Sequence, residues 1–286
     1  MDPKQLVIIA FQISIICTVF GFGLKATPDD LLYVLRRPGL LARSLIALFL
    51  IMPVVAVTLS RWFDFPRTVG IELIALALSP TPPLLPGREA RSGGHESYGL
   101  GLMAVLALLS IALVPLSLKF LGTFFGLPFS ISPATIAAIV FKAALLPLAA
   151  GLVVRALAPA VAARLEKAVW ILVMILAPLA VVAVLLSTAP AMWQLVGSGT
   201  ILAILTFLLI GLAVGHVLGG PEPDQSIVLA LSTACRHPAI ALSIVSANYP
   251  DENFGPTIIL YLLLGVVVGI PYVAWQRRHM TAHVPA

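Results

Sequence analysis

Long apolar runs are the feature of this 286-residue chain that most constrains its fold. Residues 45–52, for example, are apolar on every face of a helix, and runs of similar character recur along the chain. About 20 apolar residues in a helix span the hydrocarbon core of a bilayer. Only 10% of the residues are charged, against roughly 25% in soluble domains. The sequence therefore predicts an integral membrane protein in contact with the lipid bilayer, and excludes soluble enzymes and nucleic-acid-binding domains.

Nine runs have the length of a membrane span. They cover residues 6–24, 40–59, 68–86, 98–120, 136–157, 169–186, 200–218, 226–247 and 258–275. A transmembrane β-barrel would need polar and apolar residues in alternation, which these runs lack. We expect the first run to be a span rather than a cleaved signal peptide, because no small-residue cleavage site follows it. The predicted fold is therefore all-α, with about nine transmembrane helices.

The basic residues between the runs predict the orientation of the chain. Cytoplasmic loops of membrane proteins are enriched in Lys and Arg. One side collects eleven of them: Lys25, Arg36, Arg37, Arg43, Arg88, Arg91, Arg155, Arg164, Lys167, Arg277 and Arg278. The other side holds four: Lys4, Arg61, Arg67 and Lys119. We therefore expect a multi-pass protein of the cell (inner) membrane, with the N-terminus outside and the C-terminus in the cytoplasm.

Two of the runs contain breaks. Residues 79–87 hold four prolines, and residues 232–238 place hydroxyls, a cation, an imidazole and a proline in the middle of a run. Irregular backbone at membrane depth is tolerated only where it is buried in protein or lines a wet cavity. Breaks at corresponding places in two halves indicate a secondary transporter with inverted repeats. We expect a first repeat at 1–120 with four spans, a second at 133–278 with five, and a cytoplasmic tail at 279–286.

Three charged residues lie at least four residues inside the runs: Glu72, Lys142 and Arg236. A charge at the bilayer centre costs about 2.5–3.5 kcal/mol on insertion scales, so such a residue usually faces a cavity or a partner. Glu72 and Lys142 lie within a turn or two of a predicted helix end, where reaching to the interface is an equally good explanation. Arg236 is far from both ends of its run. We therefore expect it to act in a functional cavity.

The chain resembles the bile acid:sodium symporter family from about residue 13 onward. The resemblance rests on Gly-Phe-Gly-Leu at 21–24, Phe-Leu-Ile-Met-Pro at 49–53, the proline-rich break, and Cys-Arg-His at 235–237. It implies a core domain whose two broken helices cross at mid-membrane, and a smaller panel domain. It also implies alternating access that moves organic anions.

The resemblance also implies a set of sodium ligands, and this chain departs from it. Family members that use sodium carry an Asn at the first break, a Gln before the Phe of the second span, two hydroxyl residues in the span after the break, and a Glu with a nearby Gln at the second break. Here Leu48 precedes the Phe, and the hydroxyl positions fall near Met103 and Ala107. Ser232 stands at the position of the Glu, and Arg236 at that of the Gln.

Arg236 is also unfavourable to sodium on physical grounds. A guanidinium 4 Å from a sodium ion repels it by about 4 kcal/mol at an effective dielectric of 20, roughly a thousandfold in affinity. We therefore expect no metal and no cofactor, and we interpret Arg236 as a fixed replacement for the bound cation. A small organic anion is the expected partner. The predicted substrate-binding residues are Arg236, His237, Ser232, Thr233, Ser79 and Thr81, with Glu72 or His237 as a proton carrier.

Three functions remain open at this stage. The first is a secondary transporter of small organic anions without sodium coupling, either a facilitator or proton-coupled. The second is a sodium-dependent symporter of the bile-acid type, and the third is a degenerate transporter that serves as a receptor or structural subunit. An enzyme is not expected, because no catalytic motif occurs at membrane depth. Residues 88–97 are interpreted as a cytoplasmic turn, with gating as the alternative.

Overall fold

The computed structural model describes residues 3–125, 130–195, 197 and 199–282. All the regular elements in this part of the chain are helical, so the predicted all-α fold is confirmed. In chain order they are α1 (Pro3–Lys25), α2 (Pro28–Leu32), α3 (Pro38–Leu45), the π-helical turn η1 (Ile46–Ile51), α4 (Met52–Trp62), α5 (Arg67–Leu78), α6 (Leu85–Arg91), α7 (Glu96–Phe125), α8 (Pro133–Val140), the π-helical turn η2 (Phe141–Leu145), α9 (Leu146–Leu157), α10 (Pro159–Trp193), α11 (Thr200–Gly219), α12 (Pro223–Ala234), α13 (Pro238–Asn248) and α14 (Gly255–Ala282).

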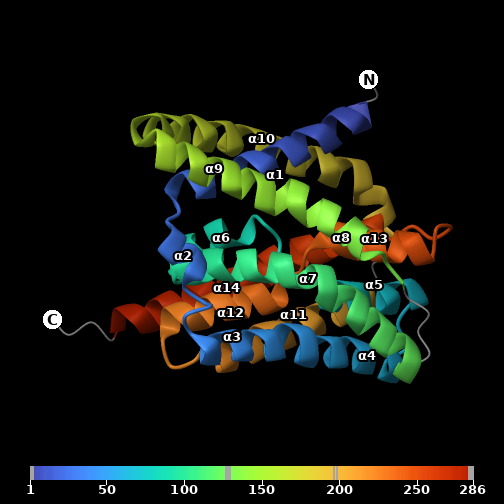
Figure 1. Ribbon diagram of the computed structural model, residues 1–286. Coiled ribbons are helices and arrows are strands. Elements are labelled where there is room, and N and C mark those ends of the chain that lie inside the picture. Colours follow the sequence, from blue (N-terminus) through green and yellow to red (C-terminus); the bar gives the residue numbers. More distant parts are fainter. Residues whose placement is uncertain (1–2, 126–129, 196, 198, 283–286) are drawn as a thin grey trace.

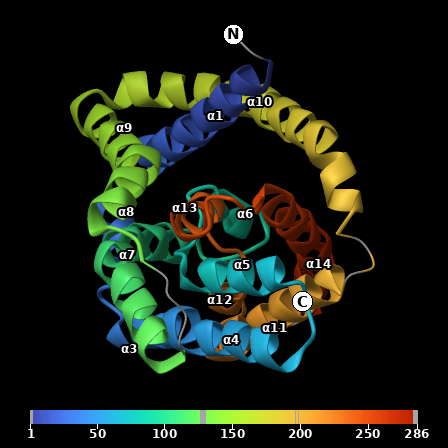
Figure 2. The ribbon, with the colours of Figure 1, turned by 90° about the vertical axis from the view of Figure 1, so that its right-hand side faces the viewer.

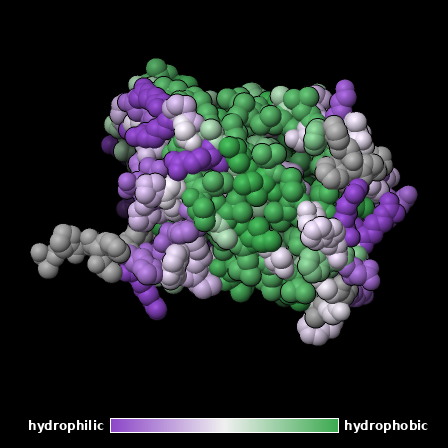
Figure 3. Space-filling view, turned by 90° about the horizontal axis from the view of Figure 1, so that it is seen from below, coloured by the Kyte–Doolittle hydropathy of each residue, from purple (hydrophilic) through white to green (hydrophobic). Residues whose placement is uncertain are grey.

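Seven helical segments of the described chain are long and apolar enough to cross a membrane. A shorter apolar helix, Ile9–Lys25, matches the first predicted run. The third predicted run, 68–86, is instead divided between α5 and α6. The face shown in Figure 3 carries a wide apolar band with hydrophilic residues at both ends, as expected for a molecule that lies in a bilayer.

The helices form two layers (Figures 1 and 2). Helix α1 packs along α9 and α10, and these three lie on one side of the molecule. The other layer contains the two broken helices together with α3, α4, α7, α11 and α14. The first layer corresponds to the smaller panel that the resemblance implies, and the second to the core.

A ladder of small residues holds α12 against α11. Glycines recur every fourth residue on α11 and face small residues on α12, which lets the two backbones touch. The pairs are Gly211 with Ala234, Gly215 with Ala230, and Gly219 with Ser226. A Cβ on Gly215 would lie 2.4 Å from the Ala230 Cα, so no larger residue fits there without separating the helices. We call these six residues the glycine ladder.

The two broken helices cross, as predicted. Half-helix α5 packs against α13, and α12 packs against α6, so each half contacts a half of the other broken helix. The backbone N–H of His237 in the second break donates a hydrogen bond of 2.8 Å to the carbonyl of Pro80 in the first. Since α5 and α12 are buried along almost their whole length, the irregular backbone lies inside protein.

Both breaks are shorter than expected. The first covers 79–84, because helix resumes at Leu85 with Pro86 in its first turn, where a missing backbone N–H costs nothing. The second covers 235–237, because Ser232 and Thr233 still belong to α12 and Pro238 begins α13. Because helix resumes at Leu85, the cytoplasmic turn expected at 88–97 is shorter than predicted. Its first four residues are helical in α6, α7 begins at Glu96, and only 92–95 connect them.

Two further boundaries differ from the sequence prediction. The sixth predicted span, 169–186, is the middle of the 35-residue helix α10, which includes Arg164 and Lys167 that were assigned to a loop. The expected tail at 279–286 begins as helix, because α14 continues to Ala282. Residues 283–286 of the tail lie outside the described part of the chain.

Candidate functional site

Arg236 lies at the crossing and is fully buried. Its guanidinium donates hydrogen bonds to three backbone carbonyls. Nε donates to Leu76 at 3.2 Å, and Nη2 donates to Leu48 at 2.9 Å and also to Ala77. The ring of Phe49 has its centroid 5.9 Å from Cζ. The cation of the second break therefore reaches the first half of the chain, where it binds the end of α5 and the middle of the α3–η1–α4 span.

A proline and a π-helical turn remove the regular α-helical donors of Leu76 and Leu48, although Leu76 still accepts a 3.0 Å hydrogen bond from the N–H of Ser79. Leu76 would pair with residue 80 and Leu48 with residue 52 in a regular α-helix. Position 80 is a proline, which has no N–H. In η1 the N–H of Met52 donates to Ala47 instead, and the next position along is Pro53. The carbonyl of Ala77 lies at the C-terminus of α5, where the last helical carbonyls have no partner.

The end of α5 also favours a cation electrostatically. A helix C-terminus carries a partial negative charge, and carbonyls at such ends coordinate cations in transporters with discontinuous helices. The guanidinium of Arg236 therefore binds carbonyl oxygens of the kind that coordinate an alkali cation.

Tyr261 on α14 closes the second break. Its hydroxyl accepts a 2.7 Å hydrogen bond from the N–H of Arg236 and donates one of 2.5 Å to the carbonyl of Ala234. Both partners belong to the end of a half-helix, where backbone groups lack helical partners. The sequence analysis did not single out Tyr261, although a tyrosine in the apolar run 258–275 is a signal for a buried polar contact.

The other predicted residues at the breaks are buried around the crossing. Ser79 donates to the carbonyl of Ala75 in its own helix. Thr81 Oγ1, His237 Nδ1 and Arg236 Nη1 are buried side-chain atoms without a hydrogen-bond partner in the described chain. Since buried polar atoms are normally paired, unpartnered atoms at one crossing are candidates for contacts with a ligand.

Ser232 and Thr233 lie one turn before the second break and make internal contacts. Thr233 donates to the carbonyl of Leu229 in its own helix. Ser232 donates a 2.7 Å hydrogen bond to Oε1 of Glu89, a buried residue of α6. The sequence analysis missed Glu89, because its position after Pro86 and Gly87 was interpreted as a cytoplasmic turn.

Arg88, next to Glu89, also points into the protein. Its Nη2 donates to the carbonyl of Gly265 on α14 at 3.1 Å, and its Nη1 approaches Sγ of Cys235 at 3.7 Å. Helix α6 is thus fixed to α12 by Glu89, and to the second break and α14 by Arg88. The two side chains join the two repeats on the same side of the crossing as the 92–95 connection.

The remaining charged residues within spans lie apart from these contacts. Glu72 is fully buried in α5, and neither carboxyl oxygen has a hydrogen-bond partner in the described chain. Lys142 lies in η2 and is exposed, in keeping with a residue that reaches toward the interface.

Three of the positions compared with sodium ligands in the sequence analysis are apolar residues. Met103 and Ala107 are buried apolar residues of α7, and Leu48 contributes its carbonyl to Arg236. Among the residues that the structure describes, no three His, Cys, Asp or Glu side chains are grouped to hold a metal ion.

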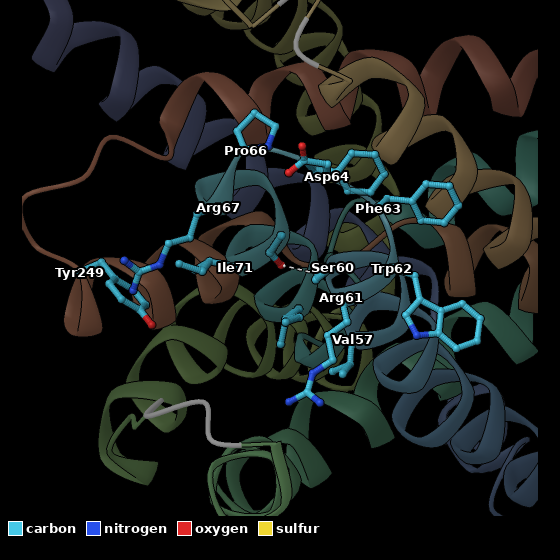
Figure 4. Close-up of a pocket in the computed structure, with 13 residues that line it drawn as sticks. Val57, Ser60, Arg61, Trp62, Phe63, Asp64, Pro66, Arg67, Ile71 and Tyr249 are labelled. Atoms are coloured by element: carbon cyan, nitrogen blue, oxygen red, sulfur yellow. Dashed lines mark hydrogen bonds between the residues drawn. The ribbon is translucent and has the colours of Figure 1, made fainter.

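A cavity of about 580 Å³ lies away from the crossing, at the connection between α4 and α5 (Figure 4). It is lined by Ser60, Arg61, Asp64, Arg67 and Tyr249 among others. Arg67 points toward Tyr249, with its guanidinium 5.6 Å from the ring centroid (Figure 4). None of the site residues predicted from the sequence lines this cavity.

Comparison with known proteins places these features in a family. The model of the Sodium Bile acid symporter family matches residues 12–195. A protein of Bacillus subtilis (strain 168) described as "Uncharacterized sodium-dependent transporter YocS" is 26% identical over 137 residues, which is 48% of this chain and 42% of that protein. The chain thus matches less than half the length of this relative. Because the family model matches more than half of the chain, the chain belongs to the Sodium Bile acid symporter family.

Proposed function

We propose that this protein is a secondary transporter of small organic anions that works by alternating access without sodium. The proposal rests on the hydrogen bonds that the guanidinium of Arg236 donates to the carbonyls of Leu48, Leu76 and Ala77. A guanidinium on these oxygens excludes a sodium ion from them by occupancy and by charge repulsion. The positive charge that a bound sodium would bring to the crossing is then part of the chain.

The same site favours an anionic substrate. The N-terminus of α13 points to the crossing at His237, and a helix N-terminus attracts negative charge. Arg236 Nη1, Thr81 Oγ1 and His237 Nδ1 supply unpartnered polar atoms beside it. A carboxylate that reaches these atoms as access opens would satisfy them. Ser79 completes the proposed binding residues, while Ser232 and Thr233 support them from α12.

A sodium-independent transporter can work in one of two ways. The protein is either a facilitator or coupled to protons, and Glu72 and His237 are the proton carriers suggested by the sequence. We place it in the cell membrane with its N-terminus outside and its C-terminus in the cytoplasm, on the distribution of basic residues.

A sodium-dependent symporter is the second candidate. It is favoured by the family's description and by the description of the Bacillus subtilis relative as a sodium-dependent transporter. In that case sodium would bind to backbone carbonyls and hydroxyls other than those held by Arg236. A receptor or structural subunit would transport nothing, so uptake separates it from both transporters.

Uptake into proteoliposomes tests the proposal. Radiolabelled taurocholate and pyruvate represent a large and a small organic anion, and each is offered in sodium chloride, potassium chloride or choline chloride. We expect uptake of at least one anion at equal rates in the three salts. Uptake that requires sodium would overturn the proposal in favour of the symporter, and absence of uptake of either anion in all three salts would contradict the transporter assignment.

A binding measurement complements uptake. A ligand that binds only the folded state raises the melting temperature. We expect sodium chloride and choline chloride to give the same melting temperature for the wild type in detergent micelles. The variant Arg236→Gln should lose anion uptake, whereas the matched variant Lys142→Gln removes an exposed charge and should keep it. A sodium-specific rise in the wild type would count against the fixed-cation interpretation.

A further inference from the structure

Glu89 is a buried carboxyl group that joins the two broken helices. Only 2% of the residue is exposed, and its Oε1 accepts a 2.7 Å hydrogen bond from Ser232. Glu89 belongs to the second half of the first broken helix, and Ser232 to the first half of the second. The contact therefore joins the two broken helices, one turn before the second break.

The surroundings of Glu89 offer little to hold a negative charge. Helices α7 and α12 pack against α6. Ser232 on α12 donates the hydrogen bond, and the titratable groups close enough to feel the Glu89 charge are Cys235 after α12, Tyr98 on α7 and the neighbouring Arg88. On α7, Gly99 lies so close that a Cβ there would be 2.4 Å from Glu89 Oε2.

The guanidinium of Arg88, the residue next to Glu89, makes its hydrogen bonds with other groups. Arg88 donates to Gly265 and to Cys235, and no salt bridge to Glu89 forms among the residues that the structure describes. In the described chain a neutral hydroxyl donates the hydrogen bond to this carboxyl, and the charge of Arg88 acts on it without an ion pair. A buried carboxylate with so little compensation is stabilised by binding a proton, which removes its charge.

We propose that Glu89 is the proton-binding site of this transporter, so that the proton is the coupling ion. The inference rests on the proposed sodium-independent transport. In one state a proton from water adds to a carboxylate oxygen of Glu89 and forms an O–H bond. In the other state that bond breaks and the proton returns to water on the opposite side. Ser232 donates to the ionised carboxylate, and it can accept from the protonated acid.

Glu89 is better placed for this task than the two carriers that the sequence suggested. Glu72 lies within one half-helix, and in the described chain its carboxyl has no hydrogen-bond partner through which a proton could affect the other broken helix. His237 holds the first break through its backbone N–H, which does not titrate. At Glu89, gain or loss of a proton changes a hydrogen bond between α6 and α12 directly.

Infrared difference spectroscopy tests the site without a transport substrate. Purified protein in lipid nanodiscs is compared between acidic and alkaline buffer, and the carbonyl stretch of protonated carboxyl groups is recorded. We expect one such band to disappear in Glu89→Gln and to persist in Glu72→Gln and in the exposed control Glu96→Gln. Ser232→Ala, which keeps the carboxyl group, should shift the frequency of that band. Identical spectra for wild type and Glu89→Gln would overturn the proposal.

Transport of taurocholate and pyruvate in sodium-free proteoliposomes tests the coupling. An inwardly directed proton gradient should raise the initial uptake rate of the wild type and of Glu96→Gln several-fold, and should leave that of Glu89→Gln unchanged. Sodium-independent uptake that ignores the gradient would overturn the role of Glu89 and leave the proposed function standing. Uptake that requires sodium would overturn the proposed function, while the infrared band would still show whether Glu89 binds a proton.

Discussion

The two broken helices share an architecture but contribute opposite chemistry to their crossing. The first break covers 79–84, and with the end of α5 it supplies backbone carbonyls that have lost their helical donors. The second break covers 235–237 and supplies the cation that binds them. Each break alone would leave buried polar groups without partners. Each broken helix therefore satisfies hydrogen-bonding groups that the other leaves open.

The same contrast holds for packing. Helix α12, which carries the cation, touches α11 backbone to backbone through the glycine ladder. Helix α5 is surrounded by larger side chains of α4 and α13, and belongs to the largest apolar cluster of the described chain. The position of the cation is thus set by close backbone contact, and that of the carbonyls by side-chain packing.

The largest effect should follow removal of the guanidinium. Arg236→Ala leaves the carbonyls of Leu48 and Ala77 without their donor, at about 1–3 kcal/mol for each buried group. We expect a loss of about 2–6 kcal/mol in the free energy of unfolding, measured by denaturation in detergent micelles. Lys142→Ala, which removes an exposed charge, is the control. Equal stability of Arg236→Ala and the wild type would show that the two breaks do not depend on each other.

A smaller effect is expected from the glycine ladder. Gly215→Ala places a methyl group 2.4 Å from backbone atoms of α12, so α11 and α12 must move apart. Overpacking of this kind costs about 1–3 kcal/mol. Gly39→Ala is the matched control, because a Cβ there meets nothing within 4 Å. If both variants unfold at the same temperature, close backbone contact does not fix the cation-bearing helix.

A substitution at Pro53 tests why the carbonyl of Leu48 has no donor within its own helix. Pro53→Ala restores a backbone N–H, which lets the span return to regular α-helix and lets Leu48 pair within it. We expect Arg236 to lose one of its three acceptors, at about 0.5–1.5 kcal/mol. Hydrogen exchange should then show protected amides across 46–53. A variant that keeps the π-helical turn would indicate that packing, rather than the proline, produces it.

The smallest effect is expected at Asp30, which lies in the short helix α2, outside both breaks. Its partial burial acts to raise its pKa, but hydrogen bonds from Ser97 and Thr27 outweigh this and lower the pKa below its usual value. A carboxyl whose pKa is lower in the folded state stabilises the fold above its unfolded pKa, about 3.9, and loses this contribution as the pH falls through the folded pKa.

The melting temperature measured against pH checks this. Wild type should lose stability on acidification below about pH 3.9, and Asp30→Asn should lose less over the same range. The exposed Asp29, which pairs with Arg36, provides the control Asp29→Asn, which should follow the wild type. The same pH profile for Asp30→Asn and the wild type would show that these capping contacts contribute nothing at acidic pH.

The two helix breaks could be predicted because their causes are local. The clustered prolines at 80, 82 and 83 interrupt a helix, and an arginine in the middle of an apolar run needs a partner in any fold. The two helix breaks therefore follow from the residues themselves and are found in the structure, whereas the crossing of the broken helices was implied by the family resemblance.

Other features depend on tertiary packing and could not be predicted. The restart of helix at Leu85 buries Glu89 because α7 and α12 cover it, and nothing in residues 85–91 alone indicates this. The free carbonyl of Leu48 arises from a π-helical turn, which apolar periodicity does not reveal. The partner of Ser232 was missed for the same reason, since the two residues are 143 positions apart.

The tethering of Arg236 has a consequence for membrane voltage. A sodium ion enters the cell with its substrate and balances the charge, but a guanidinium bound to the chain stays behind. A monovalent anion carried past it would move one uncompensated charge, which an inside-negative potential opposes by about 2.3 kcal/mol per 100 mV. Import would then be electrogenic and outward movement favoured, unless a proton travels with each anion and makes the cycle electrically silent.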